Sequence, residues 1–114
     1  MLRSADPDDG RGSDFTVRQL LDDFAGRAGS EELASQPEVE AAVRTAIGAA
    51  YRRIGDVAKA QPHLERALTL ERGLHGDGHE AVAQSLVELA WNQGEQGHLG
   101  EAEATARRAV QILR

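Results

Sequence analysis

The sequence predicts an all-α fold in which antiparallel helical hairpins stack as a short right-handed solenoid, with two repeats preceded by an N-terminal helix. One pattern of small and apolar residues occurs twice, and a fixed step of this size is typical of stacked hairpins. Aromatic residues make up 4% of the chain and all apolar residues 40%, so the helices must pack mainly through Ala, Leu and Val. The pairs that repeat at a step of 42 residues include Gly55 and Gly97, Ala60 and Ala102, and Ala67 and Ala109.

Residues 1–14 are predicted to form a flexible acidic leader. They are mostly Asp, Gly, Ser and Arg, and such a segment buries too little apolar surface to offset the entropy lost on ordering. Residues 15–36 are predicted to form a capping helix and a linker. Thr16 and Gln19 resemble a capping box, which places the start of the helix near Phe15.

The capping helix has an apolar stripe and is expected to end near Gly26 or Gly29. The segment 30–36 is open to two interpretations, because its periodicity fits either one helical turn around Leu33 or a loop. The residues of the stripe are Val17, Leu20, Leu21 and Phe24.

The first hairpin is predicted over residues 37–74. Pro37 suits the first turn of a helix, where its missing N–H is harmless, and Ser35 or Gln36 is available as the cap. That helix is expected to stop at Gly55, and a second helix to run from Val57. A turn this short makes the two helices antiparallel.

The second hairpin is predicted over residues 79–114. Its first helix has two apolar rows, which predict either neighbouring helices on both sides or a surface that faces a ligand. The two rows are Val82, Leu86, Leu89 and Ala90, and Ala83, Val87 and Trp91. Its second helix is marked by Ala102, Ala106, Ala109, Val110 and Leu113.

The composition disfavours several classes of function. A formal net charge of −6 and the lack of a dense basic stripe argue against nucleic acid and against an anionic membrane surface as partners. The chain has no cysteine, so neither a disulfide framework nor a thiolate metal site is possible. No apolar run approaches the roughly 20 residues of a membrane span. We expect a soluble, cytoplasmic protein.

The first hairpin resembles the tetratricopeptide repeat. The resemblance rests on Ile47, Gly48 and Tyr51 in the first helix, followed by Ala60 and Leu64 in the second. Arg44 stands where that pattern has Trp, and Leu64 where it has an aromatic residue. Small residues at Gly48, Ala60 and Ala67 would let the two helices approach closely.

The step of 42 residues exceeds the roughly 34 of the usual repeat, and the longer form looks like the kinesin light chain subclass. That subclass commonly has Gly-Pro-Asp-His-Pro between its hairpins. The corresponding residues 76–80 keep the Gly and the His but lack both prolines.

A narrower resemblance covers most of the chain. Three segments, at residues 2–7, 15–18 and 36–41, look like the entry into the C-terminal repeat arrays of bacterial serine/threonine protein kinases of the planctomycete and acidobacterial kind. No glycine-rich phosphate loop, His-Arg-Asp loop or Asp-Phe-Gly motif is present in the sequence, so kinase activity is not expected of these residues.

The resemblance implies that the first helix of each hairpin lines a concave groove for a peptide or a partner helix. Trp91 is the strongest candidate, because indoles are frequent anchors at interfaces, although it would equally fit packing against a neighbouring helix. The partner-binding candidates are Thr45, Ala49, Arg52, Arg53, Val87, Trp91 and Glu95. A carboxylate clamp like that of some co-chaperone relatives is disfavoured, because Ala49 and Trp91 replace its Asn.

No cofactor, metal or catalytic residue is predicted. His75, Asp77 and His79 have ligand chemistry, but the surrounding glycines argue against a rigid site, and His79 fits better as the cap of the following helix or as a solvated side chain. The acidic runs lack the spacing of a calcium loop. No histidine has a Ser or Cys at a spacing that suggests an activated nucleophile, so an enzyme is not expected.

Two hypotheses for the function follow. The first is a non-catalytic module that binds a protein or peptide, within a larger kinase or repeat protein. The second is self-association, for example as a homodimer, because a solenoid of this kind generally needs about three repeats and polar caps. The residues expected to be uncovered at the C-terminal end, and so to mediate self-association, are Ala102, Ala106, Val110 and Leu113.

Overall fold

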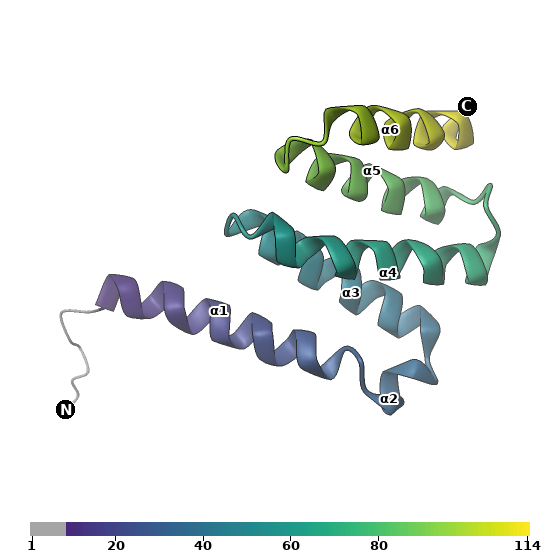
Figure 1. Ribbon diagram of the computed structural model, residues 1–114. Helices are drawn as coiled ribbons and strands as arrows, with labels where there is room; N and C mark the ends of the chain where they lie inside the picture. Colours follow the sequence, from purple (N-terminus) through teal and green to yellow (C-terminus); the bar gives the residue numbers. More distant parts are fainter. Residues whose placement is uncertain (1–8) are drawn as a thin grey trace.

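The computed structural model describes residues 9–114, with side chains from Val17 onward. This part of the chain consists of helices joined by short turns and contains no strand, which confirms the all-α class. The helices between Val57 and Leu113 lie one above another, and the N-terminal helix lies below them (Figure 1). The helices are α1 (Asp9–Arg27), α2 (Glu31–Ala34), α3 (Pro37–Arg53), α4 (Val57–His75), α5 (Glu80–Glu95) and α6 (Leu99–Leu113).

The N-terminal helix begins earlier than the sequence predicts. Helix α1 starts at Asp9 rather than near Phe15, so Thr16 lies inside the helix and does not cap it. Extending an existing helix fixes few additional dihedrals per hydrogen bond, and an acidic first residue suits the positive end of the helix dipole. Residues 9–14 of the expected flexible leader are thus helical, and the remainder of the leader lies outside the described residues.

The segment 30–36, whose periodicity fitted either a helical turn or a loop, contains a helical turn. Helix α2 is capped by Ser30, whose Oγ accepts a hydrogen bond from the backbone N–H of Leu33 at 3.3 Å. Helix α3 then begins with Pro37 at its first position, as expected. Gln36 occupies the N-cap position but makes no capping hydrogen bond with its side chain.

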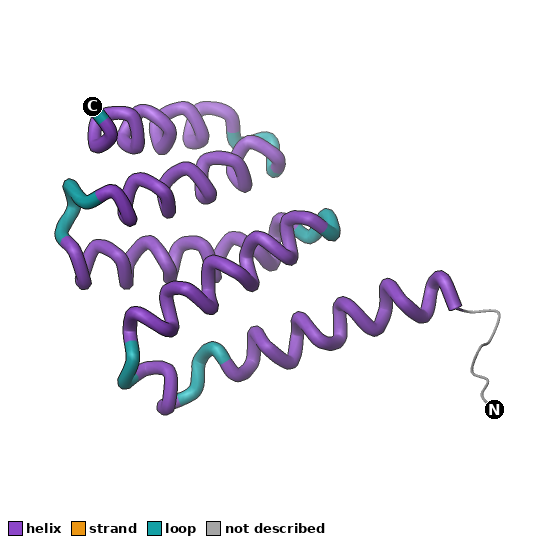
Figure 2. The backbone as a smooth tube through the Cα atoms, turned by 180° about the vertical axis from the view of Figure 1, so that it is seen from behind, coloured by secondary structure: helices purple, strands orange, loops and turns teal. Residues whose placement is uncertain are grey.

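The two hairpins end their first helices in the same way. Gly55 and Gly97 have φ values of +87° and +89°, a left-handed conformation that glycine adopts without a steric penalty. Asp56 caps the following helix by accepting from the N–H of Lys59. The short turns bring α3 against α4 and α5 against α6, and Figure 2 shows both pairs from behind. The predicted hairpins at 37–74 and 79–114 coincide with these pairs to within one or two residues.

The close approach of α3 and α4 depends on Gly48. A Cβ atom at this position would lie 2.5 Å from Cδ2 and 2.7 Å from Cγ of Leu64, a fully buried side chain. Ala60 is also fully buried. The small residues therefore have the packing role that their spacing indicates.

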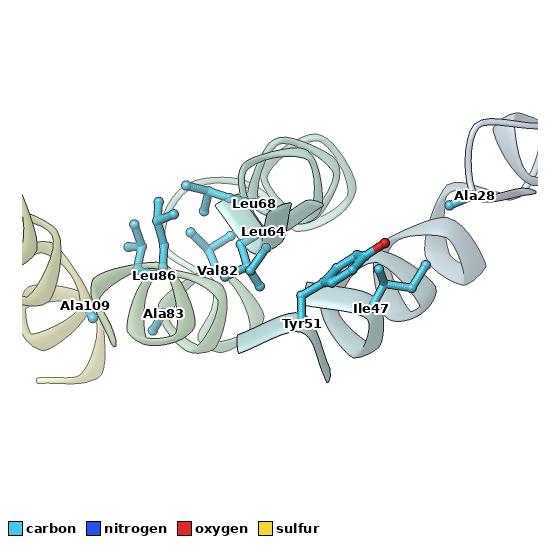
Figure 3. Close-up of a cluster of buried hydrophobic side chains, with 11 residues drawn as sticks. Ala28, Ile47, Tyr51, Leu64, Leu68, Val82, Ala83, Leu86 and Ala109 are labelled. Carbon is cyan, nitrogen blue, oxygen red and sulfur yellow. The ribbon is translucent and has the colours of Figure 1, made fainter. Parts of the chain in front are cut away.

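Helix α5 joins the two hairpins into one core. Val82 lies with Leu64 and Leu68 of α4 in a single apolar cluster, and Figure 3 shows these side chains together between the two hairpins. The cluster continues on one side to Tyr51 and on the other to Ala109 of α6. The first hairpin is thus covered by the second.

A proline lies within α4. Pro62 lacks a backbone N–H, which leaves the Ala58 carbonyl without its usual helical partner. The amide of Asn92, fully buried on α5, donates to the Val57 carbonyl at 3.0 Å and to Oε1 of Gln61 at 2.7 Å. A polar contact from α5 therefore fixes the start of α4.

We expect the substitution Gly48→Ala to destabilise the fold by about 1–3 kcal/mol, because the added methyl group displaces the buried Leu64 side chain. Gly73→Ala is the matched control. It also lies inside a helix, but its added methyl group meets no atom within 4 Å, so this change should stabilise the fold by about 0.5–1 kcal/mol through helix propensity. Thermal unfolding followed by circular dichroism measures both, and equal shifts in the two variants would contradict the packing role of Gly48.

Candidate functional site

An apolar hollow lies between α5 and α6 at the C-terminal end of the stack. We call it the C-terminal hollow; its volume is about 620 Å³. Small residues supply much of its lining, and Trp91, Val110 and Leu113 supply larger apolar side chains. The lining residues are Val87, Ala90, Trp91, Gly94, Glu95, Ala102, Glu103, Ala106, Ala109, Val110 and Leu113.

The large apolar side chains of this hollow are exposed. Trp91 is 61% exposed, Leu113 57% and Val110 52%. Trp91 therefore does not pack as a core residue, whereas Ala83 of the same row is fully buried and α5 has α4 and α6 as neighbours on its two sides. An exposed apolar cluster of this kind marks an interaction site more often than a solvated face.

A second hollow of about 560 Å³ lies between α3 and α5. Thr45 and Ala46 line it on one side, and Gln84 and Glu88 on the other. Val87 and Leu113 line both hollows, so the two surfaces are continuous.

The structure unites two sets of residues that the sequence analysis treats separately. All four residues predicted for self-association line the C-terminal hollow, together with three of the seven predicted for partner binding. The self-association set is Ala102, Ala106, Val110 and Leu113, and the three partner-binding residues are Val87, Trp91 and Glu95. The sequence spacing placed them on different helices, and only the hairpin brings them to one surface.

The other partner-binding candidates lie further along α3. Thr45 lines the second hollow, and its hydroxyl donates to the Ala41 carbonyl of the same helix. Arg52 forms an ion pair with Glu88 at 2.9 Å. Ala49 and Arg53 line neither hollow. Arg52 is thus engaged by Glu88 of α5.

The rim of the connected hollows is acidic. Glu95 and Glu103 border the C-terminal hollow, and Glu71 and Glu88 border the second. Glu88 is paired with Arg52 and Glu103 with Arg107, whose N···O distance is 3.0 Å. The surface therefore combines an apolar floor with carboxylates at its edge, which suits an apolar partner that has basic flanks.

The N-terminal end of the stack is held by polar contacts that sequence reasoning missed. The carboxylate of Glu40, 3% exposed, binds Arg44 and Arg66, each at 3.1 Å. Arg44 also donates to the Ala28 carbonyl at the end of α1. The hydrogen bond from Arg66, aided by Arg44, holds the pKa of Glu40 below its usual value. Arg44, at the position where the repeat pattern has Trp, ties α1 to α3.

His63 belongs to this polar cluster. Nη1 of Arg44 lies 3.2 Å from its Nδ1, and because a guanidinium only donates, the ring must accept there. The ring also stacks on Tyr51, with 5.9 Å between centroids. Burial, together with the charge of Arg44, lowers the pKa of His63. Protonation of this nitrogen would break its contact with Arg44.

Tyr51 provides a second link to α1. Its hydroxyl donates to Asp22, and Lys59 lies 3.3 Å from the same carboxylate. Burial raises the pKa of Tyr51, and the neighbouring Asp22 raises it further. The hydrogen bond from Tyr51 lowers the pKa of Asp22. Periodicity gives no signal for such a pair, because its partners lie on different helices.

The histidines between the hairpins have a structural role. Nδ1 of His79 accepts from the N–H of Ala81 at 3.0 Å and so caps α5, as the sequence analysis favoured. Its ring stacks on His75, with 4.2 Å between centroids. Among the residues whose side chains are described, no group of three or more His, Asp or Glu is arranged to hold a metal ion.

Comparison with known families supports the repeat pattern. The family model for the tetratricopeptide repeat matches residues 39–114. Comparison with curated proteins finds no match. Within residues 9–114, no helix is long and apolar enough to span a bilayer.

We expect acid to destabilise the fold in two phases. The folded chain holds the pKa of His63 below 6.5, so the unfolded chain binds more protons as the pH falls through 6.5, and this contribution to stability is lost below that value. Glu40, whose ordinary pKa is 4.5, behaves in the same way at lower pH.

The substitution His63→Gln should therefore flatten the pH dependence of the melting temperature between about pH 7 and 5, while leaving the lower phase in place. His98→Gln, at a histidine that is 55% exposed, is the control and should follow the unsubstituted protein. Parallel melting curves for the His63→Gln variant and the unsubstituted protein would exclude His63 as the source of the upper phase.

Proposed function

We propose that this chain, which belongs to the tetratricopeptide repeat family, is a non-catalytic module that binds a protein or peptide on the surface formed by its two connected hollows. Proteins of this family generally mediate protein–protein interaction. The observation that carries the proposal is the C-terminal hollow, whose apolar floor and exposed Trp91 are uncovered in the isolated chain.

Residues of α3 would extend this binding surface beyond the two hollows. Thr45 and Val87 line the second hollow, and Ala49 lies one turn further along α3. Arg52 and Arg53 provide cationic groups at one end of α3, with Arg52 positioned by Glu88. Trp91 acts as the anchor, because a large aromatic side chain contributes much of the binding energy when a partner desolvates it.

The cellular setting is part of the proposal. The 42-residue step and the 19-residue helix α4 support assignment to the longer, kinesin light chain-like form of the repeat. The resemblance of residues 2–7, 15–18 and 36–41 to bacterial kinase arrays supports a role in recruiting substrates to a linked kinase. Such a module would work in the cytoplasm.

Self-association is a second candidate, and one observation favours it. The C-terminal hollow has a floor of small residues, including Gly94, Ala102 and Ala106, beside the protruding indole of Trp91. One surface therefore offers both a hole and a side chain large enough to enter it. Two copies related by a two-fold axis would cover each other's hollow.

The first test is a peptide array probed with the purified chain. We expect peptides that bind the unsubstituted protein to bind the Trp91→Ala variant at least tenfold more weakly, because truncating a central aromatic anchor costs about 2 kcal/mol or more. Val39→Ala removes an exposed apolar residue of α3 that lines neither hollow, and should change nothing. Binders that respond equally to both substitutions would place the interaction elsewhere.

The second test is the oligomeric state. If two copies pair through α6, light scattering should show a dimer whose population rises with protein concentration. Val110→Asp should abolish it, because the substitution places a charge in the apolar contact. Val110 is 52% exposed in the single chain, so its replacement should leave the helical content unchanged. A monomer at every concentration would remove this second candidate.

A further inference from the structure

A glutamate of α4 lines the second hollow, the space of about 560 Å³ between α3 and α5. The side chain of this residue, Glu71, is 20% exposed, so protein atoms surround most of it. Among the residues whose side chains are described, no Lys or Arg pairs with its carboxylate, and its neighbour is Nε2 of His75, 3.4 Å from Oε1. A carboxylate that is largely withdrawn from water is costly without a cation. A cation that enters the hollow would therefore gain a favourable interaction with Glu71.

The hairpin itself does not require a carboxylate at this position. The equivalent of Glu71 in the second hairpin, 42 residues later, is Leu113. Helix α6 packs against α5 although it carries this apolar residue, just as α4 packs against α3. Helix packing therefore does not account for the charge of Glu71.

The apolar residues of the second hollow suit an aliphatic chain. Ala42 and Ala46 of α3 line it, together with Ala81 of α5. Val87 and Leu113 add apolar surface where the second hollow meets the C-terminal hollow. Lys and Arg side chains bury their methylene groups on apolar surface while their charged ends remain bound or solvated. A lining of small residues beside a carboxylate therefore matches both parts of such a side chain.

The other charges around this hollow leave the charge of Glu71 uncompensated. Glu88 also lines the hollow, but Arg52 pairs with it at 2.9 Å, so these two side chains together are neutral. No Lys or Arg of the described chain lines the hollow. The whole chain carries a formal net charge of −6, which attracts a basic partner before contact is made. Charge complementarity therefore selects a cationic group for this place.

From this arrangement we propose that the second hollow is a subsite for a lysine or arginine side chain of the bound peptide. Glu71 pairs with the cationic group, and the alanines of α3 and α5 contact the methylene chain. The inference rests on the proposed function, because the same peptide places an apolar side chain against Trp91 in the adjoining C-terminal hollow. The preferred ligand thus combines an apolar residue with a basic residue close to it in the sequence.

The probe for this proposal is a positional-scanning library of nine-residue peptides with blocked ends. In each pool one position is fixed as Lys, Arg, Gln or Glu, and the other positions vary. At one position or more, the pools fixed as Lys or Arg should bind the full chain about threefold or more tightly than the pool fixed as Gln, because a partly exposed ion pair contributes roughly this much. The pool fixed as Glu should bind most weakly. Added salt should reduce the preference for Lys and Arg.

Two substitutions in the chain locate the basic side chain. Glu71→Gln keeps the shape of the side chain and removes its charge, so the pools fixed as Lys, Arg and Gln should then bind equally. Glu65→Gln is the matched control, because Glu65 lies on the same helix, is exposed and lines neither hollow. It changes the net charge by the same amount and should leave the preference intact. Circular dichroism checks that both variants keep their helical content.

The outcomes separate the basic subsite from the proposed function. A preference for Lys and Arg that persists in the Glu71→Gln variant would overturn the proposal, and its loss in a Trp91→Leu variant would then assign the cation to the face of the indole. Equal binding of all pools by the unsubstituted chain would also overturn it. If that binding still depends on Trp91, the proposed function stands and only the basic subsite is lost. If no pool binds, both are lost.

Discussion

The architecture depends on one constraint: each helical hairpin leaves an apolar face that another helix must cover. Inside the first hairpin, Gly48 allows α3 and α4 to approach until Leu64 fills the space between them. Outside it, α5 covers Leu64 and Leu68. The same requirement applies after α6, where the C-terminal hollow is lined by apolar side chains with no covering helix in the described chain. The proposed binding surface is a consequence of how the fold is built.

The two ends of the stack differ in the kind of side-chain contact that they make. At the N-terminal end, Arg44 and Tyr51 make directional hydrogen bonds to α1, and the buried Glu40 is satisfied by two guanidinium groups. Breaking one member of such a cluster leaves an unpaired buried charge, so the position of α1 is strongly specified. At the C-terminal end the contacts are apolar and less directional. The partner binding proposed for that end would therefore depend on less directional contacts.

Part of the predicted partner-binding surface lies beside the predicted self-association residues in the structure. Trp91 and Val87 come from one apolar row of α5, and Ala106 and Val110 from the stripe of α6. Each row can be recognised in the sequence from its helical spacing. The spacing does not show which row of another helix will lie against it. Antiparallel packing across the turn at Gly97 places the two rows side by side.

The sequence by itself determined the all-α class, the two hairpins, the turns at Gly55 and Gly97 and the small residues at the helix contact, because these depend on local periodicity and on backbone preferences of single residues. Only the tertiary structure decided that Arg44 replaces the expected Trp in order to bind α1, that Asp22 meets Tyr51, and that Trp91 is exposed. Those features depend on side chains far apart in the chain. Their meeting is set by how helices pack, and no local pattern encodes it.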